Sequence, residues 1–316
     1  MDIVACCDSN YIMPTGVMFL SVCKNNKETP LHFHLIIDES VTDTETKSLN
    51  ELVANENSQN TISFYRIDSN FLSNYPSIGK FASYISKASY YRLFIANILP
   101  KEINKIIYLD CDIIVRHNLS GLLEQNINNR AIGCVIDIFD ADISIYNRLQ
   151  YPLQKGYFNA GVLLINLEYW RVENLAARFQ LFINNKQDII RSHDQDVLNC
   201  TLVDEKVELP LTYNFQSGFA FVKEQLHIDY WKYKDELEQT ISDPAIIHFT
   251  DFPKPWYTDC KNPYKEEFIK YYIMSPWAKI PLKKSDKTLK QYFALFLRER
   301  GVLSRIPNYY RSVKLK

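Results

Sequence analysis

The chain has 316 residues, of which 47% are hydrophobic and 23% charged, and this composition excludes disordered and collagen-like proteins. The net charge is only −1, but residues 282–316 contain ten basic and two acidic residues, so they carry +8 and the remainder −9. The length suits one large domain with an extension. We therefore expect a domain at 1–281 and a basic, surface-binding tail at 282–316.

Cysteines and apolar runs indicate the compartment. Seven cysteines, an odd number without a C-x-x-C pair, favour reduced core residues over a disulfide or zinc framework. The N-terminus lacks a basic segment followed by a long apolar one, and no apolar run approaches the roughly 18 residues of a membrane span. We expect a cytoplasmic protein.

Short apolar runs alternate with segments of helical period along the chain. Strands are expected at 3–7, 33–37 and 62–67, and helices at 15–24, 43–54 and 84–99. Further strands are expected at 105–109, 131–136, 158–166 and 245–249, and a helix at 194–202. This alternation predicts an α/β fold, with a sheet flanked by helices. Neither a dinucleotide fingerprint nor a P-loop motif is present.

Polar side chains follow several of these strands: Asp8, Asp110, Asp112, Asp137 and His248. Ligands of open α/β sheets gather at the carboxyl ends of strands, so these residues are the first candidates for a site.

The D-x-D pattern occurs three times, but only Asp110-Cys111-Asp112 directly follows a continuous apolar strand, and an apolar run resumes after it. Two carboxylates held there would repel each other and lose hydration, and a divalent cation would remove that cost. The alternative is a solvated turn with two surface aspartates.

His248 strengthens the metal interpretation, although one histidine on an apolar strand is more often a core residue. Lys254 follows six positions later, so an imidazole and an ammonium can meet a metal and its phosphates together. Two carboxylates, one imidazole and phosphate oxygens suit Mn²⁺ or Mg²⁺, whereas Zn²⁺ would be expected to use more histidine or cysteine.

Five segments carry a resemblance to glycosyltransferase family 8, especially the bacterial lipooligosaccharide galactosyl- and glucosyltransferases, along about 1–280. They occur in the same order: 2–11, 107–112, 158–166, 193–199 and 248–256. The resemblance implies a GT-A type fold that binds UDP-galactose or UDP-glucose through Mn²⁺, with Mg²⁺ as the other candidate. It also implies transfer of the hexose, with retention of configuration, to a hydroxyl of lipopolysaccharide or another lipid-linked glycan.

The resemblance also implies roles for individual residues. Asp110, Asp112 and His248 would be metal ligands, and Asp110 would also contact the donor. The other implied donor contacts are Asp8 and Asn10 at uridine, and Arg92 and Lys254 at the diphosphate. The residues implied around the transferred sugar are Asn159, Asp194 and Gln195. The alternatives are that Asn159 only forms a tight turn and that Asp194 only caps a helix.

Gln195 is a poor nucleophile, so we favour front-face attack, in which the departing phosphate oxygen takes the acceptor's proton.

One position departs from the family pattern H-x-x-G-x-x-K, because Asp251 replaces the glycine. A carboxylate there would repel the diphosphate unless it points away or faces the cation.

The tail contains apolar residues at helical spacing, Leu289, Tyr292, Phe293, Phe296 and Leu297, with basic residues nearby. Such a helix can bind the anionic inner face of a membrane or pack on the protein's own core. Nucleic-acid binding is not expected, since no recognition motif accompanies the basic residues.

Two other functions remain open. A sugar nucleotidyltransferase would need a glycine-rich loop after the first strand, where this chain has Asp8-Ser9-Asn10-Tyr11. A non-catalytic nucleotide- or glycan-binding relative is favoured only by Asp251.

Overall fold

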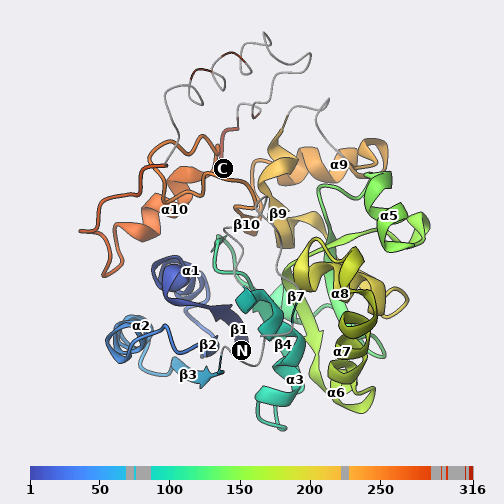
Figure 1. The fold of residues 1–316 in the computed structure, drawn as a ribbon. Coiled ribbons are helices and arrows are strands. Elements are labelled where there is room, and N and C mark those ends of the chain that lie inside the picture. The colour runs from blue at the N-terminus through green and yellow to red at the C-terminus, as the bar shows by residue number, and fades with distance from the viewer. Residues whose placement is uncertain are drawn as a thin grey trace.

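The computed structural model describes residues 1–68, 75, 87–221, 228–285, 293, 297, 310 and 313–315. Within them, one seven-stranded sheet has the order β3-β2-β1-β4-β7-β6-β8, and a smaller sheet has the order β5-β10-β9. Helices cover both faces of the large sheet (Figure 1). α1 and α2 pack on one face, with α10 packed against α1, and α6, α7 and α8 pack on the other face.

The N-terminal third is a parallel β-α-β-α-β unit, as predicted. It comprises β1 (Asp2–Cys7), α1 (Ile12–Asn25), β2 (His32–Ile37), α2 (Asp43–Glu56) and β3 (Thr61–Arg66). α2 begins with a capping box, in which Thr42 accepts from the Glu45 amide and the Glu45 carboxylate accepts from the Thr42 amide. The fold of this unit therefore follows from local sequence signals.

The helix expected at 84–99 is not a single α-helix. Its described part is a 3₁₀ segment, η4 (Lys87–Phe94), followed by the one-turn helix α3 (Ile95–Ile98). Tyr90, Tyr91 and Leu93 are all buried, so this segment has no continuous polar face. Aromatic residues are also weak α-helix formers, and packing against the sheet overrides the helical pattern here.

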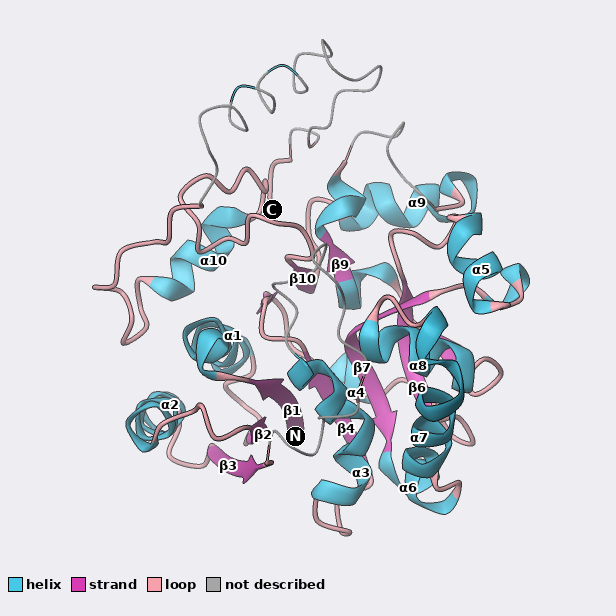
Figure 2. Ribbon diagram, viewed as in Figure 1, coloured by secondary structure: helices cyan, strands magenta, loops and turns pink. Residues whose placement is uncertain are grey.

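The second half of the large sheet is mixed. β4 (Lys105–Leu109) and β7 (Phe158–Asn166) have the predicted bounds and pair antiparallel. β6 (Ile132–Ile136) pairs antiparallel with β7 and parallel with β8 (Lys206–Glu208). Three short strands form the smaller sheet, of which β9 and β10 are labelled in Figure 2. These are β5 (Ile113–Val115), β9 (Phe215–Gln216) and β10 (Ile246–His248).

The Asp110-Cys111-Asp112 segment therefore connects two sheets, because β4 belongs to the large sheet and β5 to the small one. β5 pairs antiparallel with β10, and this register places Ile113 opposite His248. The junction thus brings the D-x-D segment and His248 together, although they are far apart in sequence.

Seven further α-helices lie in the described residues, and of these only α8 was predicted from the sequence. They are α4 (Ser120–Leu123), α5 (Ile143–Leu149), α6 (Leu167–Val172), α7 (Leu175–Lys186), α8 (His193–Thr201), α9 (Tyr230–Thr240) and α10 (Lys265–Tyr272). The short 3₁₀ segments are η1 (Ser9–Tyr11), η5 (Leu153–Lys155), η6 (Gln187–Ile189), η7 (Leu211–Asn214) and η8 (Ser217–Ala220).

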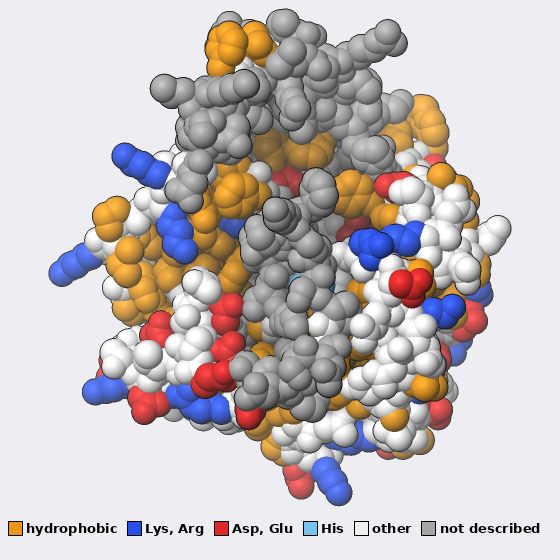
Figure 3. All heavy atoms as spheres, viewed as in Figure 1, with side chains coloured by type: hydrophobic (Ala, Val, Ile, Leu, Met, Phe, Trp, Pro, Cys, Tyr) orange, Lys and Arg blue, Asp and Glu red, His pale blue; other side chains and the backbone are white. Residues whose placement is uncertain are grey.

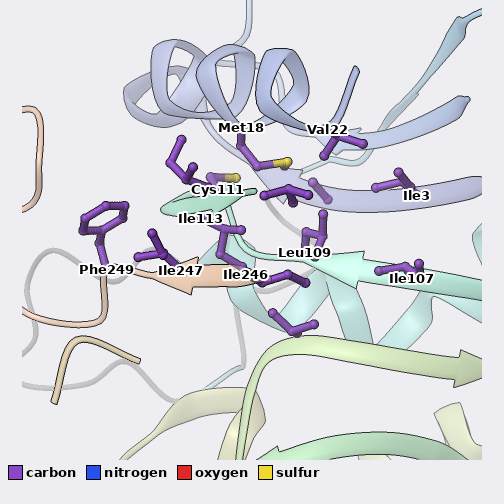
Figure 4. Close-up of a cluster of buried hydrophobic side chains, with 14 of the residues drawn as sticks. Ile3, Met18, Val22, Ile107, Leu109, Cys111, Ile113, Ile246, Ile247 and Phe249 are labelled. Atoms are coloured by element: carbon purple, nitrogen blue, oxygen red, sulfur yellow. The ribbon is translucent and has the colours of Figure 1, made fainter. Parts of the chain in front are cut away.

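Alternate residues of the central strands face the two cores. On β4, Ile107 and Leu109 belong to the core under α1, while Ile106 and Tyr108 belong to the core under α7. Figure 4 shows the first core, where Met18 of α1 lies over Leu109 and over Ile246 of β10. Both sheets are thus joined by one apolar layer directly beneath the D-x-D segment. The seven cysteines are free, and six of them are buried.

Most of the tail's expected helix at 289–297 lies outside the described residues, apart from Phe293 and Leu297. Other tail residues, Leu282, Tyr310, Val313 and Leu315, pack against the first core. In this part of the tail, the contacts agree with the alternative that the tail packs on the protein's own core. The boundary between the domain and the tail at residue 281 stays a prediction. No helix in the described ranges is long and apolar enough to cross a membrane.

Candidate active site

A cavity of about 410 Å³ lies at the carboxyl ends of β1 and β4. It is lined by nine residues predicted for the site: Asp8, Arg92, Asp110, Asp112, Asn159, Asp194, Gln195, His248 and Lys254. The tenth, Asn10, is exposed and does not line the cavity, whereas its neighbour Tyr11 does. Asp8 instead uses its carboxylate to accept the Asn10 amide, 2.9 Å away, which shapes the turn after β1.

The two D-x-D carboxylates are held by separate cations. Asp110 accepts from Arg92 Nη2 at 2.7 Å and from the Tyr108 hydroxyl at 3.0 Å. Lys254 Nζ donates to Asp112 Oδ2 at 2.7 Å. Burial would raise the pKa of Asp112, but Lys254 and His248 outweigh it and hold that pKa below its ordinary value. Asp112 is therefore ionised, and the ion pairs of both carboxylates with buried cations exclude the alternative of a freely solvated turn.

Asp110, Asp112 and His248 present one ligand atom each within 4.8 Å of one another. His248 Nε2 lies 3.2 Å from Asp112 Oδ1 and 3.9 Å from Asp110 Oδ2. Gly161 provides the space for this cluster, because a Cβ at that position would lie 2.2 Å from His248 Cε1 and 2.9 Å from Asp110 Oδ2.

A chain of hydrogen bonds determines which nitrogen of His248 carries the proton. The Gly161 amide donates to Asn159 Oδ1, which fixes that atom as an acceptor. Asn214 Nδ2 donates to the same oxygen, so Asn214 Oδ1 faces His248 Nδ1 at 2.9 Å. His248 Nδ1 must then be a donor, so Nε2, which faces the two carboxylates, is the nitrogen left for a metal ion.

An imidazole nitrogen and two carboxylates grouped in this way can hold a divalent cation. The described donor atoms, two carboxylates and one imidazole, fit Mn²⁺ or Mg²⁺ better than a structural Zn²⁺ site. These residues thus fit the cation that the sequence predicted.

Arg92 joins the metal ligands to the predicted sugar-binding residues. It is buried, with its guanidinium 4.4 Å from the Tyr108 ring centre, and it bridges Asp110 and Asp194. Its Nε lies 2.9 Å from Asp194 Oδ2 but donates to the carbonyl of Ser89 at 3.2 Å. These opposite charges keep the pKa of Arg92 well above its usual value, despite burial.

Asp194 has an oxygen available for a substrate. Burial raises its pKa to about 6, although Arg92 acts in the opposite direction. Asp194 Oδ2 is buried and accepts no hydrogen bond from the described residues. The N-cap residue of α8 is Ser192, so the alternative that Asp194 is only a helix cap is not observed. Asp194 Oδ2 forms an ion pair with Arg92, and a substrate hydroxyl would supply the hydrogen bond that it lacks.

The turn before Asp194 has an unusual backbone. His193 has φ 44°, in the left-handed region that side chains other than glycine seldom adopt. Its ring stacks on Tyr90 with centroids 5.1 Å apart, and its Nδ1 is 3.0 Å from the Ser89 hydroxyl. These contacts hold the first turn of α8, which carries Asp194 and Gln195, toward the cavity.

Gln195 and Asn159 share one buried carboxylate. Both donate to Asp137 Oδ2, Asn159 at 2.9 Å and Gln195 at 3.1 Å. Gln195 Oε1 in turn accepts the Ala160 amide at 3.0 Å. Asn159 and Gly161 lie within β7 and form no tight turn; the Asn159 side chain accepts the Gly161 amide and also orders Asp137 and Asn214. The side-chain planes of Asn159 and Gln195 are thus fixed from both ends.

Sequence reasoning missed Asn214 entirely. It is fully buried at the end of η7, outside every motif, and no local pattern distinguishes it from other asparagines. Asp137 was noticed only as a residue at a strand end. Burial raises its pKa, and the hydrogen bonds from Asn159 and Gln195 oppose that change.

The comparison with known proteins agrees with the geometry of the site. The sequence model described as "Glycosyl transferase family 8" matches residues 2–260. The chain belongs to glycosyltransferase family 8. This membership confirms the predicted family and favours a transferase over the sugar nucleotidyltransferase that the sequence left open.

This family 8 chain is 30% identical to General stress protein A of Bacillus subtilis over 88% of its length and 94% of that protein. It is 29% identical to the Lipopolysaccharide 1,2-glucosyltransferase of Escherichia coli K12, over 85% of this chain and 77% of that protein. The crystal structure of the galactosyltransferase LgtC with donor and acceptor sugar analogs superposes with a TM-score of 0.78. The two chains are 26% identical, and the match covers 87% of this chain and 96% of LgtC. The predicted GT-A type fold is confirmed.

Gly161→Ala tests the geometry of the metal site. The added methyl group would lie 2.2 Å from His248 Cε1, so the imidazole must move away from the carboxylates. We expect Mn²⁺ affinity, measured by calorimetric titration, to fall by roughly 10- to 100-fold, as when outer groups of metal sites are lost. The matched control is Gly121→Ala, whose nearest neighbour is the Tyr213 hydroxyl at 3.0 Å. Equal Mn²⁺ affinity in the two variants would contradict the proposed metal site.

Proposed function

We propose that this glycosyltransferase transfers a hexose from UDP-galactose or UDP-glucose to a glycan hydroxyl, with retention of configuration. The proposal rests on one observation above all, the grouping of His248 Nε2 with the carboxylates of Asp110 and Asp112 while His248 Nδ1 is engaged by Asn214. That arrangement favours a divalent cation, for which Mn²⁺ is the first candidate and Mg²⁺ the second. The cation would neutralise the UDP leaving group when bound.

The relatives support the choice of substrates. One is named a Lipopolysaccharide 1,2-glucosyltransferase, and another, from Salmonella typhimurium, a Lipopolysaccharide 1,3-galactosyltransferase. LgtC is a galactosyltransferase that was solved with donor and acceptor sugar analogs. We infer that the acceptor here is lipopolysaccharide or another lipid-linked glycan.

Two basic residues are proposed to contact the diphosphate. Arg92 is buried next to Asp110, and Lys254 is buried next to Asp112. Lys254 Nζ also donates to the carbonyls of Phe249 and Thr250, at 2.6 and 3.2 Å. Its contact with Asp112 is therefore the one that a phosphate oxygen would replace. Asp8 and Asn10, in the turn after β1, remain the proposed uridine contacts.

Asp194 and Gln195 would act on the sugar. Asp194 Oδ2, which accepts no hydrogen bond from the described residues, would accept a sugar hydroxyl, and Gln195 would stay in the orientation that Asp137 and Ala160 impose. In front-face attack, the bond from the anomeric carbon to the phosphate oxygen breaks as the bond to the acceptor oxygen forms. The acceptor's proton then passes to the departing phosphate oxygen, and no covalent enzyme intermediate is needed.

A UDP-release assay with Mn²⁺ and a panel of UDP-sugars, with and without glycan acceptors, tests this function. We expect release by the wild type and a loss of roughly 100-fold in Asp110→Asn and Asp112→Asn, because each substitution removes a charge that holds the cation. Asp142→Asn, in another D-x-D pattern, is the control, because asparagine also caps α5. Absence of release from every donor would favour the non-catalytic alternative.

We also propose a cytoplasmic location with peripheral attachment to the inner face of the membrane. The tail carries +8, and its exposed residues Lys283 and Lys284 follow a body that carries −9. Exposed apolar residues lie nearby in sequence, at and after the end of α10: Ile273, Met274 and Ile280. In Figure 3, hydrophobic side chains gather beside α10. Basic and apolar groups together favour an anionic bilayer surface.

Lys283→Glu combined with Lys284→Glu tests the attachment. Each lysine near an anionic leaflet contributes about 1 kcal/mol, so we expect at least about tenfold weaker sedimentation with phosphatidylserine vesicles. The control with the same charge change is Lys101→Glu with Lys186→Glu, two exposed residues outside the tail. Equal loss in both double variants would argue against a specific surface.

A further inference from the structure

The loop between His248 and Lys254 contains the residue that departs from the family pattern. Asp251 stands where H-x-x-G-x-x-K has glycine, so a carboxylate lies between a proposed metal ligand and a proposed diphosphate contact. Its neighbours Thr250 and Lys254 line the cavity, but Asp251 does not. The carboxylate must therefore be held away from the anion-binding centre.

The position of this loop determines where Lys254 lies relative to the D-x-D segment. The Phe249 amide donates to the Asp112 carbonyl at 2.9 Å, which ties the loop to the D-x-D segment. The carbonyls of Phe249 and Thr250 accept from Lys254 Nζ. A shift of the loop would thus displace Lys254 relative to Asp112.

The partner of Asp251 comes from the far end of the chain. The Tyr310 hydroxyl donates to Asp251 Oδ2 at 2.9 Å, across 59 residues of sequence. Burial raises the pKa of Asp251, and the Tyr310 hydrogen bond is the strongest influence that favours its charged form. Lys254 and His248 act in the same direction from the other side of the loop.

Tyr310 is itself fixed by several contacts. Its ring packs on Phe221 with centroids 4.8 Å apart, and the backbones of these two residues form an antiparallel bridge. Asn262 hydrogen-bonds the Tyr310 hydroxyl. Asn262 Nδ2 also donates to Ser217 Oγ, which donates to the His248 carbonyl. Tyr310 is therefore linked to the start of the loop at His248 as well as to Asp251 in its middle.

We propose that Tyr310 and Asp251 are positioning residues of the transferase site. The hydrogen bond between them holds the Asp251 carboxylate outside the cavity and keeps the loop in register with Asp112. The C-terminal segment is then a structural part of the donor site, through a contact that a glycine at position 251 could not make.

This inference rests on the proposed function for its kinetic consequences. Without the Tyr310 hydroxyl, the Asp251 carboxylate gains by turning toward Lys254, where it competes with the diphosphate. Donor binding should suffer more than the chemical step, since neither residue touches the cavity. Replacing Asp251 by glycine as well removes the competing carboxylate and should restore donor binding.

The test is a double-variant cycle with Tyr310→Phe and Asp251→Gly. We expect Tyr310→Phe to raise the KM for the UDP-sugar about tenfold, the effect of a lost hydrogen bond to a buried charge, with kcat changed less than about twofold. In the Asp251→Gly background the same change should leave KM unaltered. Equal effects of Tyr310→Phe in both backgrounds, or no effect in either, would overturn the proposal.

Hydrogen exchange of the protein alone separates this proposal from the proposed activity. We expect faster amide exchange in the peptide 249–256 of Tyr310→Phe, and near wild-type exchange in Asp251→Asn, which still accepts from the hydroxyl. Tyr65→Phe is the control, because it loses a hydroxyl contact to His34 instead. Unchanged exchange at 249–256 in Tyr310→Phe contradicts the positioning role even if no donor is turned over.

Discussion

The concentration of negative charge at one edge of the sheet is the constraint on which the site depends. Besides Asp8, four carboxylates line this cavity: Asp110, Asp112, Asp137 and Asp194. Burial weakens hydration and strengthens their mutual repulsion, so the fold must compensate each of them. Arg92 lies between two of them, Lys254 contacts a third, and side-chain amides hold the fourth. The two D-x-D carboxylates remain close enough together to need a further cation.

The protein meets this constraint by joining its two sheets at the D-x-D segment. β4 delivers Asp110 from the large sheet, and β10 delivers His248 from the small one. The backbone amide of Gly161 then sets the orientation of Asn159 and, through Asn214, the protonated nitrogen of His248. A main-chain group thus determines which nitrogen of His248, a proposed metal ligand, is left to face the two carboxylates. Such rigidity suits a site that must bind charge without reorganising.

Much of the fold and the site could be predicted because their signals are local. Apolar runs such as 105–109 mark buried strands, and polar residues at their ends mark the site. The 3₁₀ geometry of η4 could not be predicted, since it depends on the burial of Tyr90 and Tyr91 against other elements. Asn214 acquires its importance only from its partners in space, which sequence periodicity does not encode.

The most direct measurement of the central claim is pulsed electron paramagnetic resonance of Mn²⁺ bound to protein labelled with ¹⁵N-histidine. The chain has six histidines, and the account predicts hyperfine coupling to one directly coordinated nitrogen, that of His248. The coupling should disappear in His248→Ala. Mn²⁺ spectra without any ¹⁵N coupling, or with coupling that persists in His248→Ala, would contradict the proposed Asp110, Asp112 and His248 site.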